Sequence, residues 1–140
     1  RLVDLGSGAG LPGIVIKIAR PDITTVLLES ARMKALFLRH VQTELGLEGL
    51  EVVHGRAESR EVLNGHAERY DWVTVRAVSG LQEIWKLSRP LLNASGRMVA
   101  SKGPEGKDEA PVELEGTPHI EEIQADVPGL GRERRLLVVG

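Results

Sequence analysis

Four glycines fall within eight residues near the start of the chain, directly after a short apolar run. Residues 3–13 read Val-Asp-Leu-Gly-Ser-Gly-Ala-Gly-Leu-Pro-Gly, and a helix-compatible segment, Ile14 to Arg20, follows at once. Glycines at this spacing let the backbone turn sharply and leave main-chain atoms open to a ligand, because no Cβ stands in the way. A strand, a glycine-rich turn and a helix in this order predict the nucleotide-cofactor end of an α/β fold.

Two cofactor motifs fit this turn. Residues 8–13 match G-x-G-x-x-G, the dinucleotide fingerprint, whereas residues 4–10 match D-x-G-x-G-x-G, which resembles motif I of S-adenosylmethionine-dependent methyltransferases. In the dinucleotide fold the first glycine of the fingerprint closes the first strand. Here the strand closes at Gly6, two residues before that triplet begins. The register therefore favours a methyltransferase, and a dinucleotide-binding oxidoreductase remains the alternative.

Composition limits the class of protein. The chain has 140 residues, enough for one domain with its own core, and 41% of them are hydrophobic. It has no cysteine, which excludes disulfides, thiolate metal sites and a cysteine nucleophile. No apolar run approaches the roughly 18 residues of a membrane-spanning helix. We therefore expect a cytoplasmic protein without a membrane partner, although its net charge of −2 lacks the basic excess of most nucleic-acid-binding domains.

Short apolar segments alternate with helical periodicities, which is typical of βαβ units around a parallel sheet. The predicted strands are 2–5, 24–29, 50–54, 72–75, 97–101, 119–125 and 134–139. Helices are predicted over 11–20, 31–45 and 81–92, a short helix or loop over 59–69, a turn over 93–96 and a loop or weak helix over 103–116. The last two strands are predicted to pair antiparallel around 128–131. This order predicts the Rossmann-like, seven-stranded α/β sheet of class I methyltransferases, ending in an antiparallel hairpin.

Ligands of an open α/β sheet bind at the carboxyl ends of its strands. Glu29 ends the second predicted strand, 19 residues after Gly10, where its carboxylate can accept hydrogen bonds from both hydroxyls of a ribose. The alternatives are a solvent-exposed acid at a strand end and a residue that caps the next helix. Asp4 ends the first strand, and it either contacts the cofactor or holds the glycine turn through backbone N–H groups.

Three further strand ends offer candidates. Ala57 leaves room for a flat ring beside Glu58, although a loop that opens a helix explains the same pair. Arg76 ends a buried strand, so its guanidinium must be paired or face a cleft, where it can bind a carboxylate or a phosphate bidentately. A structural salt bridge is the alternative. Lys102, at the end of the fifth strand, follows the same logic.

Basic residues gather in two places that phosphates could contact, and a solvated surface explains them equally well. They are Arg32, Lys34, Arg39, Arg132, Arg134 and Arg135. The four histidines lack the spacing of metal ligands, so no metal is expected. Neither a phosphate-binding P-loop nor a G-x-S-x-G nucleophile elbow is present.

Several of these motifs together resemble the RsmG (GidB) family of bacterial methyltransferases. The matching segments are residues 5–13, residues 27–30 with Lys34 and 37–39, Gly55-Arg56-Ala57-Glu58, Arg76-Ala77-Val78 and Lys102-Gly103. Members of this family methylate N7 of a guanine in 16S ribosomal RNA of the small ribosomal subunit. The resemblance implies S-adenosyl-L-methionine as cofactor, with contacts at Gly6, Leu11, Ala57, Glu58 and Arg76. To these we add Gly8, Gly10 and Glu29 as predicted cofactor-binding residues.

The chain departs from the family in what precedes its first strand. Family members begin with a helical segment that this sequence does not contain, so we expect one methyltransferase domain over residues 1–140, part of a longer monomeric protein. Guanine N7 carries a lone pair and no proton, so the expected reaction needs no general base, and no catalytic residue is identified. Methylation of a small molecule or protein, and a non-catalytic domain that binds only cofactor or ribosome, remain alternatives.

Overall fold

The computed structural model describes residues 1–76, 80–102, 114–116, 118–125, 129 and 134–140. Ala77, Val78, Gly103 and Arg132, and the side chain of Lys102, lie outside the described residues. So do most of the predicted 103–116 segment and most of the turn over 128–131. The elements in chain order are β1 (Leu2–Leu5), α1 (Gly13–Ala19), β2 (Thr25–Glu29), α2 (Arg32–Glu44), β3 (Leu50–His54), α3 (Arg60–His66), β4 (Tyr70–Arg76), α4 (Leu81–Ser88), the 3₁₀ helix η1 (Arg89–Leu91), β5 (Leu92–Lys102), β6 (Ile120–Ala125) and β7 (Arg134–Val139).

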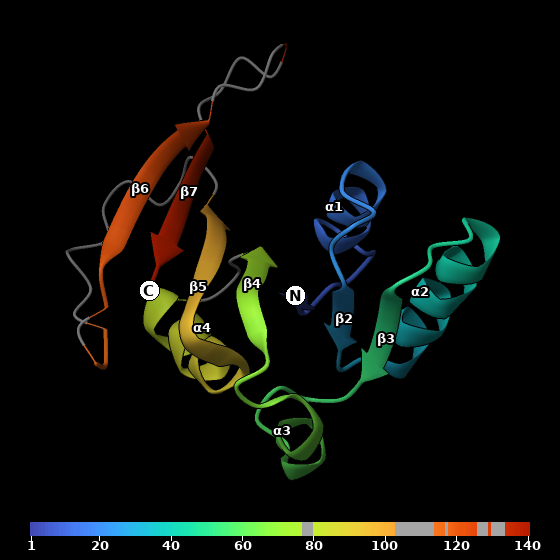
Figure 1. Cartoon of the computed structure of the whole chain (residues 1–140), viewed down its shortest axis with the longest axis horizontal. Coiled ribbons are helices and arrows are strands. Elements are labelled where there is room, and N and C mark those ends of the chain that lie inside the picture. The colour runs from blue at the N-terminus through green and yellow to red at the C-terminus, as the bar shows by residue number, and fades with distance from the viewer. Residues whose placement is uncertain (77–79, 103–113, 117, 126–128, 130–133) are drawn as a thin grey trace.

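The strands form one seven-stranded sheet in the order β3-β2-β1-β4-β5-β7-β6. The first five in that order pair in parallel, and β7 runs antiparallel to both β5 and β6. Figure 1 shows the β6–β7 pair at one end of the sheet and β3 with α2 at the other. The predicted Rossmann-like sheet with its closing hairpin is confirmed. The strand order reverses between β1 and β4, which is the point where open α/β sheets bind ligands.

The turn predicted over residues 93–96 is wrong, because this segment belongs to β5. β5 advances from Leu92 to Arg97 while β4 advances only from Tyr70 to Trp72, so β5 carries the extra residues as a bulge. A Cβ on Gly96 would lie 2.6 Å from the carbonyl oxygen of Tyr70. Glycine at this position lets the bulged strand β5 approach β4. In the sequence, a glycine needed for such a close approach looks the same as a glycine needed for a turn.

The helix predicted over 81–92 also ends early. α4 stops at Ser88, and η1 takes the chain to Leu91. Pro90 explains the change, because it lacks the N–H that would continue the α-helical hydrogen bonds. The segment predicted as a short helix or loop over 59–69 contains α3. Ser59 caps the first turn of this helix, because its Oγ accepts a hydrogen bond from the N–H of Val62.

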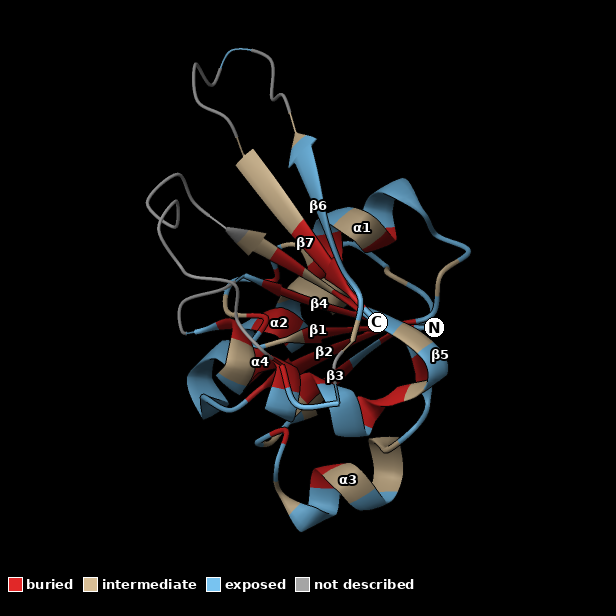
Figure 2. Ribbon diagram, turned by 90° about the vertical axis from the view of Figure 1, so that its left-hand side faces the viewer, coloured by how far each residue is buried: buried red, intermediate tan, exposed pale blue. Residues whose placement is uncertain are grey.

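Helices cover both faces of the sheet, and each face has its own core. On one face α1 and α2 bury a small cluster made of Ile14, Leu27, Ala35, Leu38, Leu50 and Val52. On the other, α3 and α4 pack on a larger cluster that runs along β1, β4, β5 and β7 and includes Val3, Tyr70, Val73, Ile84, Trp85 and Met98. Figure 2 shows the buried strands enclosed between these helices. Because aromatic residues are scarce, aliphatic side chains supply most of both cores.

Candidate functional site

The glycine turn after β1 depends on left-handed backbone conformations. Gly6, Gly8 and Gly10 have φ angles of 67°, 58° and 89°, which residues with a side chain rarely adopt. Inside the turn the N–H of Gly10 donates to the carbonyl of Ser7 at 2.8 Å, and the Ser7 hydroxyl donates to the carbonyl of Asp4 at 2.8 Å. A Cβ on Gly6 would meet no atom within 4 Å, so this part of the turn faces open space.

The later glycines of the turn serve packing instead. A Cβ on Gly10 would lie 3.1 Å from Leu38 of α2, and one on Gly13 would lie 2.8 Å from a carboxylate oxygen of Asp4. Glycine at these two positions therefore lets α1 and the turn lie close against the sheet and α2. The motif thus combines an open position at Gly6 with two filled ones at Gly10 and Gly13.

Asp4 is buried beneath this turn. Its Oδ2 accepts a hydrogen bond from the N–H of Gly13 at 3.0 Å, and its Oδ1 accepts one from Thr74 Oγ1 at 3.3 Å. Burial raises the pKa of Asp4 to about 6, although these hydrogen bonds and the positive charge of Arg76 act in the opposite direction. The geometry supports the turn-holding interpretation of Asp4, because the carboxylate fixes the first residue of α1.

Glu29 links the glycine turn to α2. Its Oε2 accepts a hydrogen bond from the N–H of Gly8 and its Oε1 accepts one from the N–H of Ala31, both at 2.8 Å. Ala31 is the residue directly before α2, so the carboxylate also satisfies an N–H at the start of that helix. The side chain is only 5% exposed. A carboxylate has about four acceptor positions, so these bonds leave capacity for further donors.

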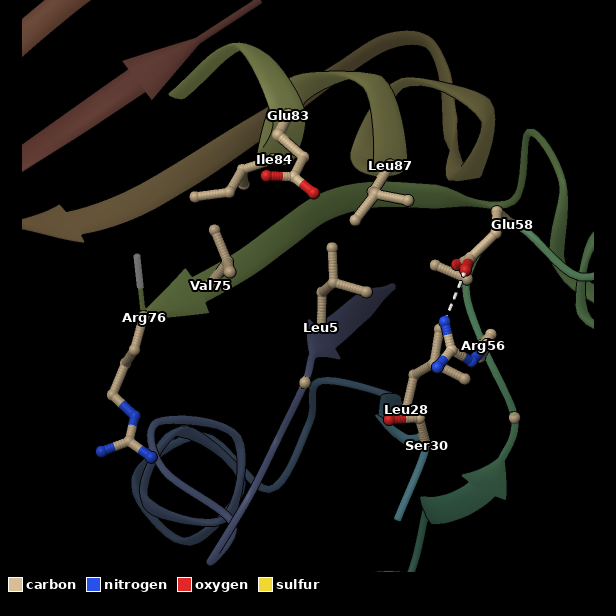
Figure 3. A pocket seen from close by; sticks show the side chains of 13 residues that line it. Leu5, Leu28, Ser30, Arg56, Glu58, Val75, Arg76, Glu83, Ile84 and Leu87 are labelled. Atoms are coloured by element: carbon tan, nitrogen blue, oxygen red, sulfur yellow. Dashed lines mark hydrogen bonds and ion pairs between the residues drawn. The ribbon is translucent and has the colours of Figure 1, made fainter. Parts of the chain in front are cut away.

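A cavity of about 400 Å³ opens at the carboxyl ends of the strands, between β1, β2, β3, β4 and α4. Figure 3 shows the side chains of Leu5, Val75, Ile84 and Leu87 pointing toward one another across it. Charged groups stand at its edges. The full lining is Leu5, Gly6, Leu28, Ser30, Gly55, Arg56, Ala57, Glu58, Val75, Arg76, Glu83, Ile84 and Leu87. An apolar interior with a few polar groups is typical of a small-molecule site.

The cavity brings together four of the predicted site residues, namely Gly6, Ala57, Glu58 and Arg76. The other four do not line it. Gly8 and Glu29 lie next to it, because Gly8 adjoins Arg76 and is hydrogen-bonded to Glu29. Gly10 is buried in the packed part of the turn, and Leu11 is 43% exposed.

Arg76 is exposed at the end of β4, and its side chain extends past the cavity toward the glycine turn (Figure 3). Its Nη2 lies 3.4 Å from the place that a Cβ of Gly8 would occupy. Within the described part of the chain no carboxylate forms an ion pair with Arg76. The cleft-facing interpretation therefore fits better than a salt bridge. By contrast, Arg56 and Glu58 pair with each other at 3.3 Å.

Sequence reasoning missed the contribution of α4 to the cavity. Glu83, Ile84 and Leu87 project from this helix into the lining. The apolar spacing of residues 81, 84, 87 and 91 is visible in the sequence, but it indicates only a helix face that packs on something. Its position directly after the strand at the reversal point is the signal that would have placed this face over the site.

Two kinds of feature are not found in the residues that the structure describes. No cluster of three histidine or acidic side chains could hold a metal ion there. Among the same residues, no helix is long and apolar enough to cross a membrane.

Comparison with solved structures defines the class of fold. A predicted O-methyltransferase from Agrobacterium tumefaciens has a TM-score of 0.75 at 19% identity, over 99% of this chain and 72% of that one. A mutant of MtNAS in complex with S-adenosylmethionine has a TM-score of 0.67 at 21% identity, over 99% of this chain and 54% of that one. The fold is that of class I methyltransferases.

Comparison of sequences narrows the class to one family. The model of the GidB family, rRNA small subunit methyltransferase G, matches residues 1–138, and the chain belongs to this family. A ribosomal RNA small subunit methyltransferase G from Mycobacterium avium is 50% identical over 78% of this chain and 44% of its own length. Its counterpart from Chromobacterium violaceum is 41% identical over 98% of this chain and 64% of its own length. The chain spans about half the length of the curated relatives it matches.

Proposed function

We propose that this chain binds S-adenosyl-L-methionine and transfers its methyl group to N7 of a guanine in 16S ribosomal RNA of the small ribosomal subunit. The observation that carries the proposal is the cavity at the reversal point of a methyltransferase sheet, with Gly6, Ala57, Glu58 and Arg76 around it. Family membership supports the choice of ribosomal RNA as substrate. Such a reaction takes place in the cytoplasm, and we propose that location for the protein.

The residues present fit the cofactor part by part. Leu28, Ile84 and Leu87 offer apolar walls for the adenine ring, and the small side chain of Ala57 leaves room at its edge. Glu29 retains acceptor capacity for the ribose hydroxyls. Arg76 presents a guanidinium to the methionine carboxylate, which it can bind through two parallel hydrogen bonds.

The glycine turn completes the proposed site. Gly6 and Gly8 let the methionine part approach the main chain closely, since a Cβ on Gly6 would project into open space and one on Gly8 would meet Arg76. We propose that Gly10 and Leu11 act through the backbone of the same turn, and that Glu58 borders the adenine site beside Ala57.

The acceptor atom determines what the protein must supply. When bound, the cofactor supplies an electrophilic methyl group on a sulfonium centre. Guanine N7 has an in-plane lone pair and no proton, so no side chain has to act as a base. The task of the chain is to hold the two reactants in line and keep water out, which lowers the barrier by positioning. Because methylated N7 carries positive charge, a nearby carboxylate would stabilise the product electrostatically.

Calorimetric titration with S-adenosylmethionine tests the cofactor. We expect micromolar binding, about −8 kcal/mol, by the wild-type protein. Arg76→Ala should weaken it at least tenfold, because a charge-assisted pair is lost, and Arg89→Ala, which removes an exposed arginine outside the cavity, should not. Binding of NADH in place of S-adenosylmethionine would favour the dinucleotide alternative instead.

Mass spectrometry of nucleosides tests the substrate. Small ribosomal subunits and free 16S RNA that lack the modification are incubated with full-length protein and cofactor, and 7-methylguanosine is measured. We expect this nucleoside from at least one of the two substrates. Cofactor binding with transfer only to a small molecule or a protein would contradict the proposed substrate and leave the proposed cofactor intact.

A further inference from the structure

A second, shallower hollow lies on the other side of the glycine turn. It measures about 250 Å³ and is lined by Gly8, Ala9, Met33, Lys34 and Phe37. Three of these residues come from the first two turns of α2, which lies over β3 at the edge of the parallel part of the sheet (Figure 1). We call this surface, together with the neighbouring Arg32, the α2 patch.

Two large apolar side chains of the α2 patch are exposed to solvent. Met33 is 75% exposed and Phe37, the only phenylalanine of the chain, is 49% exposed. Ala35 and Leu38 already provide the buried side of this helix. Met33 and Phe37 are four residues apart, so they form a neighbouring pair on its outer side. The helix therefore has a separate buried side, and it does not need Met33 and Phe37 for packing against the sheet.

The positive charges of the α2 patch lie at the N-terminus of a helix, where they are electrostatically unfavourable. The first turn of α2 contains Arg32 and Lys34 and no acidic residue. Positive side chains are unfavourable near a helix N-terminus, where the helix dipole already contributes positive charge. The chain as a whole has a net charge of −2, so these exposed cations stand out from its average. Such an arrangement is complementary to a polyanion.

The glycine turn separates the α2 patch from the cavity. Gly6 lines the cavity, whereas Gly8 and Ala9 line the hollow of the patch. Glu29 joins the turn to the start of α2 through its hydrogen bonds to Gly8 and Ala31. A molecule on the patch is therefore next to the cofactor site and outside it.

We propose that the α2 patch binds single-stranded RNA beside the target guanine, with one unstacked base lying on Phe37 and Met33 and its phosphate at Lys34. This inference rests on the proposed function, since it names where the RNA of that reaction is held. A nucleotide of single-stranded RNA presents a flat apolar face and an anion within one unit. The patch offers the aromatic face of Phe37 and, three residues earlier on the same helix, the cation of Lys34. Stacking of this kind tolerates any base.

Substitution of Phe37 distinguishes stacking from other uses of an apolar surface. In the full-length protein, Phe37→Leu should weaken binding of a 16S RNA transcript about tenfold, because the aromatic face is lost. Phe37→Trp should keep wild-type affinity within about threefold. Trp72→Leu is the matched control, because Trp72 is 40% exposed at the start of β4, and it should leave RNA binding unchanged.

The salt dependence of binding tests the phosphate contact. For single-stranded RNA each neutralised phosphate adds about −0.7 to the slope of log affinity against log salt. Lys34→Gln should therefore reduce the slope by about 0.7. Lys86→Gln, at an exposed lysine of α4 that lines neither hollow, should leave the slope unchanged.

Cofactor titration of the same variants separates the two proposals. We expect every variant to bind S-adenosylmethionine like the wild type within about twofold, so that only the RNA step is affected. If Phe37→Leu binds RNA normally, or if Phe37→Trp loses as much as Phe37→Leu, the α2 patch is not a stacking site. If the wild-type protein binds no S-adenosylmethionine, the proposed function fails as well.

Discussion

The two faces of the sheet differ in how closely the helices pack against the carboxyl ends of the strands. On the α1–α2 face, a Cβ on Gly10 would lie 2.2 Å from Ile14 and one on Gly13 would lie 2.4 Å from Leu27, so no room remains for a side chain at either position. On the α3–α4 face, the strand ends meet α4 across a cavity of about 400 Å³. We call the α1–α2 side, which is packed without space, the closed face. We call the α3–α4 side, which leaves space for a ligand, the open face.

This difference shows how one motif divides its work. The closed face fixes the turn, since Asp4 holds Gly13 and Glu29 holds Gly8. The turn, once fixed, presents Gly6 to the open face. Rigidity on one side thus makes the binding surface on the other reproducible, which is what positioning of two reactants requires.

The largest effect should come from filling the closed face. Gly13→Ala places a methyl group 2.8 Å from a carboxylate oxygen of Asp4, so it should destabilise the protein by about 2–4 kcal/mol despite the better helix propensity of alanine. Urea unfolding measures the change. Gly65→Ala in α3 is the control, because its Cβ would meet no atom within 4 Å, and it should stabilise by about 0.5–1 kcal/mol. Equal effects at both positions would disprove the tight packing.

The buried carboxyl of Asp4 should make stability depend on pH. Because its folded-state pKa of about 6 lies above the ordinary value of 3.8, the folded protein binds this proton more tightly than the unfolded chain. Its contribution to stability is therefore complete below about pH 4 and is lost as the pH rises through 6. The Asn side chain of Asp4→Asn does not titrate, so the stability of this variant relative to the wild type should rise with pH by at most about 3 kcal/mol, whatever it loses by accepting only one of the two hydrogen bonds. A difference that stays constant from pH 4 to 8 would contradict the raised pKa.

One substitution made on each face compares them directly. Leu38→Phe, on the closed face, should cost about 1–3 kcal/mol of unfolding free energy, because a fully buried leucine has no space to expand. Leu87→Phe, at the cavity, should cost less than about 1 kcal/mol and should weaken binding of S-adenosylmethionine instead. Thermal unfolding and calorimetry measure both. The contrast between the faces fails if Leu87→Phe is the more destabilising of the two.

The smallest effect should come from the N-terminal cap of α3, a helix that follows the cavity-lining residues 55–58 in the sequence. Ser59→Ala removes the side-chain oxygen that accepts the N–H of Val62, so it should cost about 1 kcal/mol in stability. Ser59→Asp keeps an acceptor at the same place and should recover most of that loss. Denaturant unfolding of both variants checks the cap, and an equal loss in both would show that the cap does not stabilise α3.

Most of the fold was predictable because its elements follow local rules. β1, β3 and β7 occur within the predicted bounds, since apolar runs between glycine, proline and charged residues set their ends. The bulge at residues 93–96 was not predictable, because Asn93 forms a turn-like hydrogen bond with the N–H of Ser95 inside a continuing strand. Only the pairing with β4 reveals that the chain continues as a strand.

The candidate site was predictable only in part for a similar reason. Residues at strand ends are found from the sequence, because parallel strands place their carboxyl ends at one edge of the sheet. The position of α4 directly after β4 indicates that this helix covers the site, but the size of the cavity beneath the helix depends on packing. The open and filled glycines of residues 6–13 look alike in the sequence, and only the neighbours of each absent Cβ distinguish them.

The glycine turn also has a consequence for how such sequences vary. At Gly6 nothing obstructs a side chain, and only the left-handed backbone disfavours one, so asparagine or aspartate is an acceptable substitute there. At Gly13 the backbone is ordinary and the neighbouring atoms exclude every side chain. A survey of laboratory variants for folding should therefore find tolerance at Gly6 and none at Gly13, whereas a side chain at Gly6 would project into the proposed cofactor site and should impair binding.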